Sequence, residues 1–222
     1  MKKLAALVVA FLLASCAGIP NAGEVQVVPD LQLDFDAATT RAIVRPPVAG
    51  MNQLEIVQGF VNSHADPTAN YEISRLYLSN AINRFWRANK VEVIDSSSAV
   101  FELVESNIIS MTYDRIGVLN NSGELEFLEE PLSQVALFET KRQGGEIRIL
   151  QAPTNAYMSI ADLNRSYSPQ QLYFFNSDYS RLVPVSRWLP GSDVGLATRL
   201  VNELLDGPTA GLEVSLRSAI PA

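Results

Sequence analysis

The spacing of apolar residues changes at Val91, and this change restricts the chain to a fold with separate helical and strand regions. Before Val91, apolar residues recur at intervals of three and four, which is typical of helices with one buried face. After Val91 they alternate with polar residues, which is typical of strands. The expected helices span about 51–64 and 69–77, with a third, short helix that Ser79 can cap and that carries Ile82, Phe85 and Trp86.

Directly after this change, six consecutive strands are expected, separated by residues that favour turns. Asn120-Asn121-Ser122-Gly123 predicts one hairpin, and Gln143-Gly144-Gly145 predicts a second. Helices followed by consecutive antiparallel strands predict an α+β domain, with N-terminal helices packed on one face of a curved sheet. This order is compatible with a cystatin-like or NTF2-like fold. The expected strands span 91–95, 100–104, 108–119, 124–128, 135–142 and 146–150.

The run of strands is expected to end at Pro153 and Asn155, and Ser159 can then cap a short helix through Leu163. A final strand pair of the same domain is expected at 172–175 and 182–185. The predicted domain therefore spans residues 51–188.

Residues 189–222 are expected to start a second domain, because so short a segment cannot bury a core alone. Asp193 can cap a helix with an apolar face, Gly207-Pro208 ends that helix, and a shorter helix is expected to follow. We expect the remainder of this domain to be missing from the chain. The alternative is a helical cap on the first domain. The apolar face comprises Ala197, Leu200, Val201 and Leu204.

The first sixteen residues have the pattern of a bacterial lipoprotein precursor. Lys2 and Lys3 precede an apolar run that ends near Ala14, which is about half the roughly 20 residues that a membrane span needs. Leu13-Ala14-Ser15-Cys16 resembles a lipobox. We therefore expect residues 1–15 to be a signal peptide and Cys16 to become an S-diacylglyceryl, and optionally N-acylated (palmitate-type), N-terminus. Residues 16–50 would form a tether and extended arm, with a strand-like alternation at 31–36.

Composition limits the chemistry of the mature chain. Removal of residues 1–15 leaves 15 basic and 24 acidic residues, so that nucleic acid and anionic lipid headgroups repel the domain. The lipid must then supply the membrane affinity. Cys16 is the only cysteine, which excludes disulfides, a further thiol nucleophile and cysteine metal sites. No cofactor is expected.

Two groups of polar residues are weak candidates for catalysis or metal binding. Ser63, His64 and Asp66 are almost contiguous and lack the sequence context of a hydrolase triad, so His64 is expected to be a surface histidine near a helix end. Asp30, Asp34 and Asp36 lack the glycine and glutamate of a calcium loop and are expected to be a solvated face. We therefore expect no catalytic residues and no metal ligands.

A ligand pocket is the remaining possibility within an NTF2-like cone. Tyr113 and Asp114 lie on the longest expected strand, where some NTF2-like proteins place a catalytic base, but neighbouring strand residues face opposite sides of a sheet. Aromatic residues after the sheet are expected to pack in the core and at the domain junction. They are Tyr157, Tyr167, Tyr173, Phe174, Phe175 and Trp188.

Several segments, taken in order, resemble the actinobacterial LpqB lipoproteins. The segments that resemble the start of these proteins are Cys16-Ala17-Gly18-Ile19-Pro20, Arg45-Pro46-Pro47 and Ile56-Val57-Gln58-Gly59-Phe60-Val61. Further matches are Tyr77-Leu78-Ser79, Phe85-Trp86, Gln171-Leu172-Tyr173-Phe174-Phe175, Leu182-Val183-Pro184 and Trp188-Leu189-Pro190. The segments similar to the start of that family's germination-protein-M (GerMN) domain are Leu196-Ala197-Thr198-Arg199-Leu200-Val201, Leu204-Leu205-Asp206-Gly207-Pro208 and Arg217-Ser218-Ala219-Ile220-Pro221.

The resemblance implies a lipoprotein anchored in the cell membrane, on its extracytoplasmic face. It also implies a non-enzymatic accessory that binds and modulates the extracytoplasmic part of a sensor histidine kinase. That kinase belongs to a two-component system for envelope homeostasis and division. Residues 189–222 would be an incomplete start of a GerMN-like α/β domain, without the family's propeller. The alternative is an NTF2-like pocket that binds or isomerises a small apolar ligand.

Overall fold

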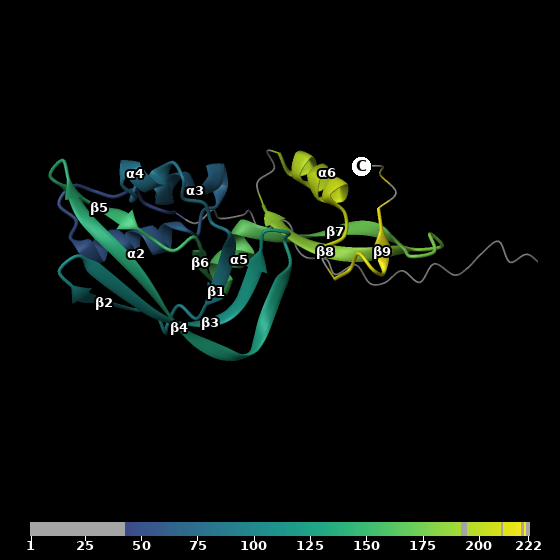
Figure 1. Ribbon diagram of the computed structural model, residues 1–222, viewed down its shortest axis with the longest axis horizontal. Coiled ribbons are helices and arrows are strands. Elements are labelled where there is room, and N and C mark those ends of the chain that lie inside the picture. The colour runs from purple at the N-terminus through teal and green to yellow at the C-terminus, as the bar shows by residue number, and fades with distance from the viewer. Residues whose placement is uncertain (1–42, 192–194, 210, 219, 221–222) are drawn as a thin grey trace, which may run out of the picture. The chain divides into compact units, whose positions relative to one another are not determined.

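The computed structural model describes residues 43–191, 195–209, 211–218 and 220 (Figure 1). The predictions that concern Cys16, the arm at 31–36 and the Asp193 cap lie outside these residues. The first three helices are α2 (Gln53–Ser63), α3 (Thr68–Arg75) and α4 (Asn80–Asn83). They occupy the region where sequence periodicity predicts helices.

A six-stranded sheet follows the helices in the described chain, and the predicted α+β class is confirmed. The strand order is β5-β4-β3-β1-β6. Strand β1 pairs with residues 115–120 of β3, and β2 pairs with residues 108–112 of the same strand. All pairs are antiparallel except β1 with β6. The NTF2-like label stays a prediction. The strands are β1 (Lys90–Ile94), β2 (Val100–Glu105), β3 (Ile108–Asn120), β4 (Leu125–Gln143), β5 (Glu146–Gln151) and β6 (Ala156–Ser159).

Two strand predictions need correction. The segments 124–128 and 135–142 are parts of one long strand, β4, which leaves its regular register between the Arg115–Leu132 and Gly117–Phe127 pairs. The expected end of the sheet at Pro153 and Asn155 is wrong, because β6 follows and pairs with β1. A parallel pair joins segments that are distant in sequence, so neither turn residues nor periodicity could reveal it.

A second sheet contains the strand pair that was expected to end the first one. The described strands pair in the order β8-β7-β9. Helix α6 (Leu196–Asp206) has Gly195 as its N-cap, and its end at Gly207 is as expected. The residues after it form turns and β9 instead of the predicted shorter helix. The strands are β7 (Tyr167–Asn176), β8 (Leu182–Pro190) and β9 (Leu216–Arg217), and helix α5 (Ile160–Ser166) precedes them.

The turn between β3 and β4 contacts strand β8 of the second sheet. Both sheets belong to one compact unit, Thr39–Ala222. The amide of Trp188 donates a hydrogen bond of 2.7 Å to the carbonyl of Gly123. Gly123 has a φ of 73°, and a Cβ there would lie 3.1 Å from the carbonyl oxygen of Trp188. Arg187 is buried and pairs with Glu124 at 3.3 Å. The turn therefore requires glycine both for its backbone conformation and for its close approach to β8.

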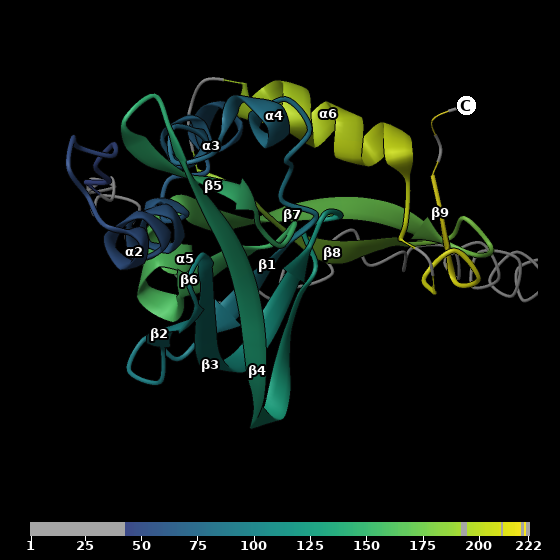
Figure 2. The same ribbon diagram turned by 60° about the vertical axis from the view of Figure 1, so that its left-hand side comes forward.

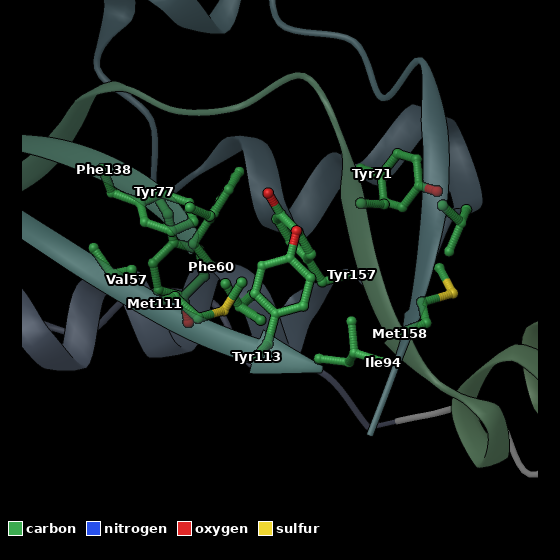
Figure 3. Packing of buried hydrophobic residues seen from close by; sticks show 14 of the residues in the cluster. Val57, Phe60, Tyr71, Tyr77, Ile94, Met111, Tyr113, Phe138, Tyr157 and Met158 are labelled. Carbon is green, nitrogen blue, oxygen red and sulfur yellow. The ribbon is translucent and has the colours of Figure 1, made fainter. Parts of the chain in front are cut away.

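Helix α2 supplies the centre of the main core. Asn52 begins it with a capping box, in which Asn52 and Glu55 accept each other's backbone amide protons. Val57 and Phe60 are fully buried and lie beside Met111 and Phe138 of the sheet (Figure 3). Figure 1 shows α2, α3 and α4 together on one side of strands β3 and β4, and Figure 2 shows α6 above strands β7 and β8.

Helix α3 and the segment after it depart from the predicted regular helices. Ala69, Asn70 and Tyr71 all have φ between 47° and 58°, which is the left-handed region. Ser79 occupies the N-cap of α4, but its side chain makes no capping bond. The third helix is shorter than expected: it ends at Asn83, so that Ile82 lies in it, whereas Phe85, which is 81% exposed, and Trp86, which is buried, follow it.

Candidate functional site

His64 is completely buried, so the expectation of a surface histidine is wrong. Its ring stacks on Trp86, with 5.7 Å between centroids, and meets Phe60 and Tyr71 edge-on. Nδ1 accepts the backbone amide of Tyr157 at 3.3 Å, whereas Nε2 is buried with no hydrogen-bond partner. Burial lowers the pKa of His64 to about 3, so the ring is neutral in the folded protein at pH 7.

The structure does not assemble Ser63, His64 and Asp66 into a catalytic group. The hydroxyl of Ser63 donates to the carbonyl of Phe60 and lies 2.8 Å from the hydroxyl of Ser74. Asp66 Oδ1 accepts the amide of Thr68. These hydrogen bonds stabilise the end of α2 and the start of α3. The hydroxyl of Ser63 is therefore not oriented as a nucleophile toward the imidazole of His64.

Tyr113 belongs to a buried polar network that the sequence did not reveal. Its hydroxyl donates to Glu92 Oε2 at 2.5 Å, and its ring contacts that of Tyr157, with 5.2 Å between centroids (Figure 3). Glu92 Oε1 accepts from Asn155 Nδ2 at 3.0 Å and pairs with Lys90 Nζ at 3.0 Å. Burial, followed by the bond to Glu92, raises the pKa of Tyr113 well above its usual value.

This network leaves Tyr113 without the properties of a catalytic base. Its phenol stays protonated, and its proton is committed to a carboxylate that has three further partners, Lys90, Arg115 and Asn155. Alternation in β1 alone predicts that Glu92 faces solvent. Its burial depends on Tyr113 and Asn155, which no local pattern connects to it.

Asp114 faces the other side of β3, as strand geometry predicts for the neighbour of Tyr113. Its backbone accepts from the amide of Asp95 and donates to the hydroxyl of Ser98, which anchors the turn between β1 and β2. Within the described ranges, no group of three or more His, Cys, Asp or Glu side chains could hold a metal ion. Asp30, Asp34 and Asp36 lie outside those ranges.

The aromatic residues predicted for packing divide into two groups. Tyr157, Tyr167 and Phe174 are buried, which confirms the prediction for them. Tyr173 is 55% exposed, because its side chain points to the opposite face of β7 from Phe174. Trp188 is partly buried against the main core.

An exposed row, apolar on β2 and β4 and polar on β3, crosses the side of the sheet opposite the buried core residues. Directly paired residues share a face, and the register aligns Val100 with Thr112 and Val135, and Ser110 with Leu137. Val100, Val135 and Leu137 are 51%, 63% and 55% exposed, whereas Ala136, between the last two, is buried. We call this surface the outer sheet face. Its residues are Val100, Glu102, Ser110, Thr112, Val135 and Leu137.

An open groove of about 600 Å³ lies between helix α2, strands β1 and β2, and helix α5. Val61, Ile94, Phe101 and Tyr157 contribute apolar walls. Asp162 and Arg165, which form an ion pair, lie among its polar lining residues. Neither Glu92 nor Tyr113 lines this groove.

Comparison with known protein families gives two adjacent matches. The model of the N-terminal domain of lipoprotein LpqB matches residues 46–164, which is just over half of the chain and includes the first sheet. The chain belongs to the LpqB lipoprotein family. A second model, described as sporulation and spore germination, matches residues 171–222 and therefore most of the second sheet.

Relatives named Lipoprotein LpqB align along nearly the whole chain. The protein of Thermobifida fusca is 30% identical and covers 96% of this chain, and that of Rhodococcus opacus is 25% identical and covers 97%. The LpqB protein of Mycolicibacterium smegmatis is 26% identical and covers 99%. The chain spans only 36–38% of the length of these relatives. No solved structure shows significant similarity.

Among the described residues, no helix combines the length and the apolar character needed to cross a membrane. The LpqB family is one of lipoproteins, and the cysteine on which such an anchor would depend, Cys16, precedes the described residues.

Proposed function

We propose that this chain is a lipid-anchored, extracytoplasmic accessory protein that modulates a sensor histidine kinase by direct contact. Membership of the LpqB family supports the lipoprotein part of this proposal. The outer sheet face supports the contact part, because a soluble domain seldom leaves large apolar side chains exposed together without a partner. The kinase, and its role in envelope homeostasis and division, come from the family resemblance.

The buried polar residues support a role that is not enzymatic. His64 is neutral and enclosed by aromatic rings, and Tyr113 is held by Glu92. Acid–base catalysis needs a group whose pKa lies near the working pH and which can reach a substrate. Neither residue meets both conditions.

The anchor is tested by Cys16→Ala, with Ser15→Ala as the matched control. The first change removes the thiol that would be acylated, whereas the second keeps a small residue beside it. We expect only Cys16→Ala to leave an uncleaved or soluble precursor, measured by fractionation and lipid labelling. Membrane-bound, lipid-labelled protein of mature size from Cys16→Ala would refute the lipoprotein assignment.

The contact with the kinase is tested with an isolated sensor domain. Two partners tethered to one membrane have a high effective concentration, so weak intrinsic affinity is sufficient. We expect weak binding in solution, and a greater loss of signalling on removal of the anchor than from Asp114→Asn. No binding at millimolar concentrations, with both proteins folded, would contradict the proposal.

A second candidate function is binding of a small apolar ligand, which the groove between α2 and α5 favours. Its volume lies within the range of about 300–1,000 Å³ that is usual for ligand sites, and Phe101 and Tyr157 offer apolar contacts. The test is a screen of small apolar compounds by thermal shift. A compound that stabilises the chain and loses its effect in Phe101→Ser, without loss of kinase binding, would favour this function.

A further inference from the structure

Carboxylates outnumber cations around the outer sheet face. Residues 100–139, which include β2, β3 and most of β4, contain eight carboxylates and a single cation, Arg115. Arg115 lies 3.6 Å from Glu92 in the buried network, so the carboxylate of Glu92 offsets its positive charge. Lys141, the next residue after Glu139 on this side of β4, pairs directly with Arg148 of β5, so the cations of this side lie at its β4–β5 end.

Three of these carboxylates lie close to the exposed row. Ser110 of β3 pairs with Glu102 of β2 at one edge and with Leu137 of β4 at the other edge. Glu102 and Leu137 are therefore on the same face of the sheet. Glu139, two residues beyond Leu137, accepts a hydrogen bond from Asn107 at 3.1 Å. Asp114, two residues beyond Thr112, shares its side of β3. The outer sheet face thus has apolar side chains on β2 and β4, polar ones on β3 between them, and carboxylates close by.

We infer that the outer sheet face binds a protein surface on which apolar residues stand beside lysine or arginine. This inference rests on the proposed function, because it assumes that the chain acts by protein contact. Opposite charges accelerate encounter and set orientation, while Val100, Val135 and Leu137 supply apolar area to bury.

The same charges make two other occupants unfavourable. A second copy of this chain would place Glu102, Asp114 and Glu139 against a second set of the same carboxylates, and like charges across an interface oppose association. An anionic membrane surface would repel the carboxylates in the same way. A cationic protein surface is the occupant that satisfies both the apolar side chains and the carboxylates close to them.

The probe is a fluorescent amphipathic peptide of lysine and leucine, with a peptide of glutamate and leucine as its counterpart. The complete lipid-anchored chain is held in phosphatidylcholine nanodiscs, and empty nanodiscs provide the blank. We expect the lysine peptide to bind, the glutamate peptide not to bind, and affinity to fall as salt concentration rises. Binding of both peptides alike, or no binding of the lysine peptide, would overturn the inference.

Matched variants localise the binding. Leu137→Ser removes a side chain that is 55% exposed on the outer sheet face, and Leu205→Ser removes one that is 56% exposed on α6. Glu102→Lys reverses a charge on this face, whereas Glu72→Lys reverses an exposed charge on α3. We expect Leu137→Ser and Glu102→Lys each to weaken peptide binding about tenfold, equivalent to about 1.4 kcal/mol. Equal effects of the test and control variants would overturn the inference.

Two measurements test the competing occupants. Sedimentation that reveals a dimer abolished by Leu137→Ser would assign the face to a second copy. Binding of the Cys16→Ala chain to phosphatidylglycerol vesicles, if lost in Leu137→Ser, would assign it to the membrane. Either result would overturn the inference.

The isolated sensor domain separates this inference from the proposed function. Equal binding of that domain to Leu137→Ser and Leu205→Ser chains would remove the outer sheet face from the interface and leave the proposed function intact. If the sensor domain does not bind even the unaltered chain, the proposed function fails, and the peptide probe still decides the chemistry of the face.

Discussion

The hydroxyl groups of Tyr71 and Tyr167 lie 3.1 Å apart in a buried contact between helix α3 and strand β7. Burial raises the pKa of both phenols, so that one neutral hydroxyl donates and the other accepts. The contact connects a helix beside the first sheet to the first strand of the second sheet.

Loss of either hydroxyl should leave the other unsatisfied. We expect Tyr167→Phe or Tyr71→Phe to lower the free energy of unfolding by about 1–3 kcal/mol, and the double variant to lose clearly less than the sum. Tyr173→Phe, at an exposed position on the same strand, is the control and should have little effect. The measurement is urea unfolding, and additive losses would show that the two hydroxyls are not coupled.

The left-handed residues of α3 predict a stabilising substitution. Ala69 is exposed and has φ 47°, where a residue with a Cβ is disfavoured by about 1–2 kcal/mol. We expect Ala69→Gly to raise the free energy of unfolding by about 0.5–1 kcal/mol, after allowance for the greater entropy of the unfolded chain. Ala81→Gly in α4 should do the opposite, because that position is helical. The same sign for both variants would contradict the left-handed geometry.

Gly59 should not tolerate alanine, although alanine favours helices. A Cβ at position 59 would lie 2.5 Å from a ring carbon of Tyr77, whose hydroxyl donates to the carbonyl of Arg45. We expect Gly59→Ala to lower the free energy of unfolding by about 1–3 kcal/mol through displacement of that ring. Asn62→Ala, on an exposed position of the same helix, should be tolerated. A Gly59→Ala protein as stable as the unaltered chain would mean that Tyr77 is free to move.

His64 should make stability depend on pH. Its pKa is about 3 in the folded protein and 6.5 as a reference, so below pH 6.5 the unfolded chain binds a proton that the folded chain does not. The unaltered chain should therefore be fully stabilised above pH 6.5 and lose about 2 kcal/mol by pH 5. Chemical unfolding at both pH values, compared with His64→Gln, isolates this effect from that of the carboxylates. Parallel pH profiles for the two proteins would refute it.

Features that depend on neighbouring residues were predictable from the sequence. Asn120 Oδ1 accepts the amides of Ser122 and Glu124, so the predicted turn closes through its own residues. Ser159 accepts the amide of Asp162 and caps α5 as expected. Helix spacing before Val91 and alternation after it gave the α+β class, because each period reflects one buried face.

Burial of individual polar residues was decided by the tertiary structure. His64 was expected at the surface because it follows a helix end, but the ring is covered by Trp86, which lies 22 positions further along the chain. Glu92 is in an alternating strand, yet Tyr113 and Asn155 enclose its carboxylate. Patterns within a few residues cannot reveal which distant side chains will cover a group.

The partition of strands between the two sheets was likewise a tertiary result. The sequence by itself determined that Leu172, Phe174 and Val183 lie in strands, from their alternation and the turn residues between them. Only the folded chain assigned those strands to a sheet with β9, whose Leu216 joins the same small core. Hydrogen bonds between strands form between backbones, which are alike in every strand, so the choice of neighbour depends on how side chains from the whole chain pack.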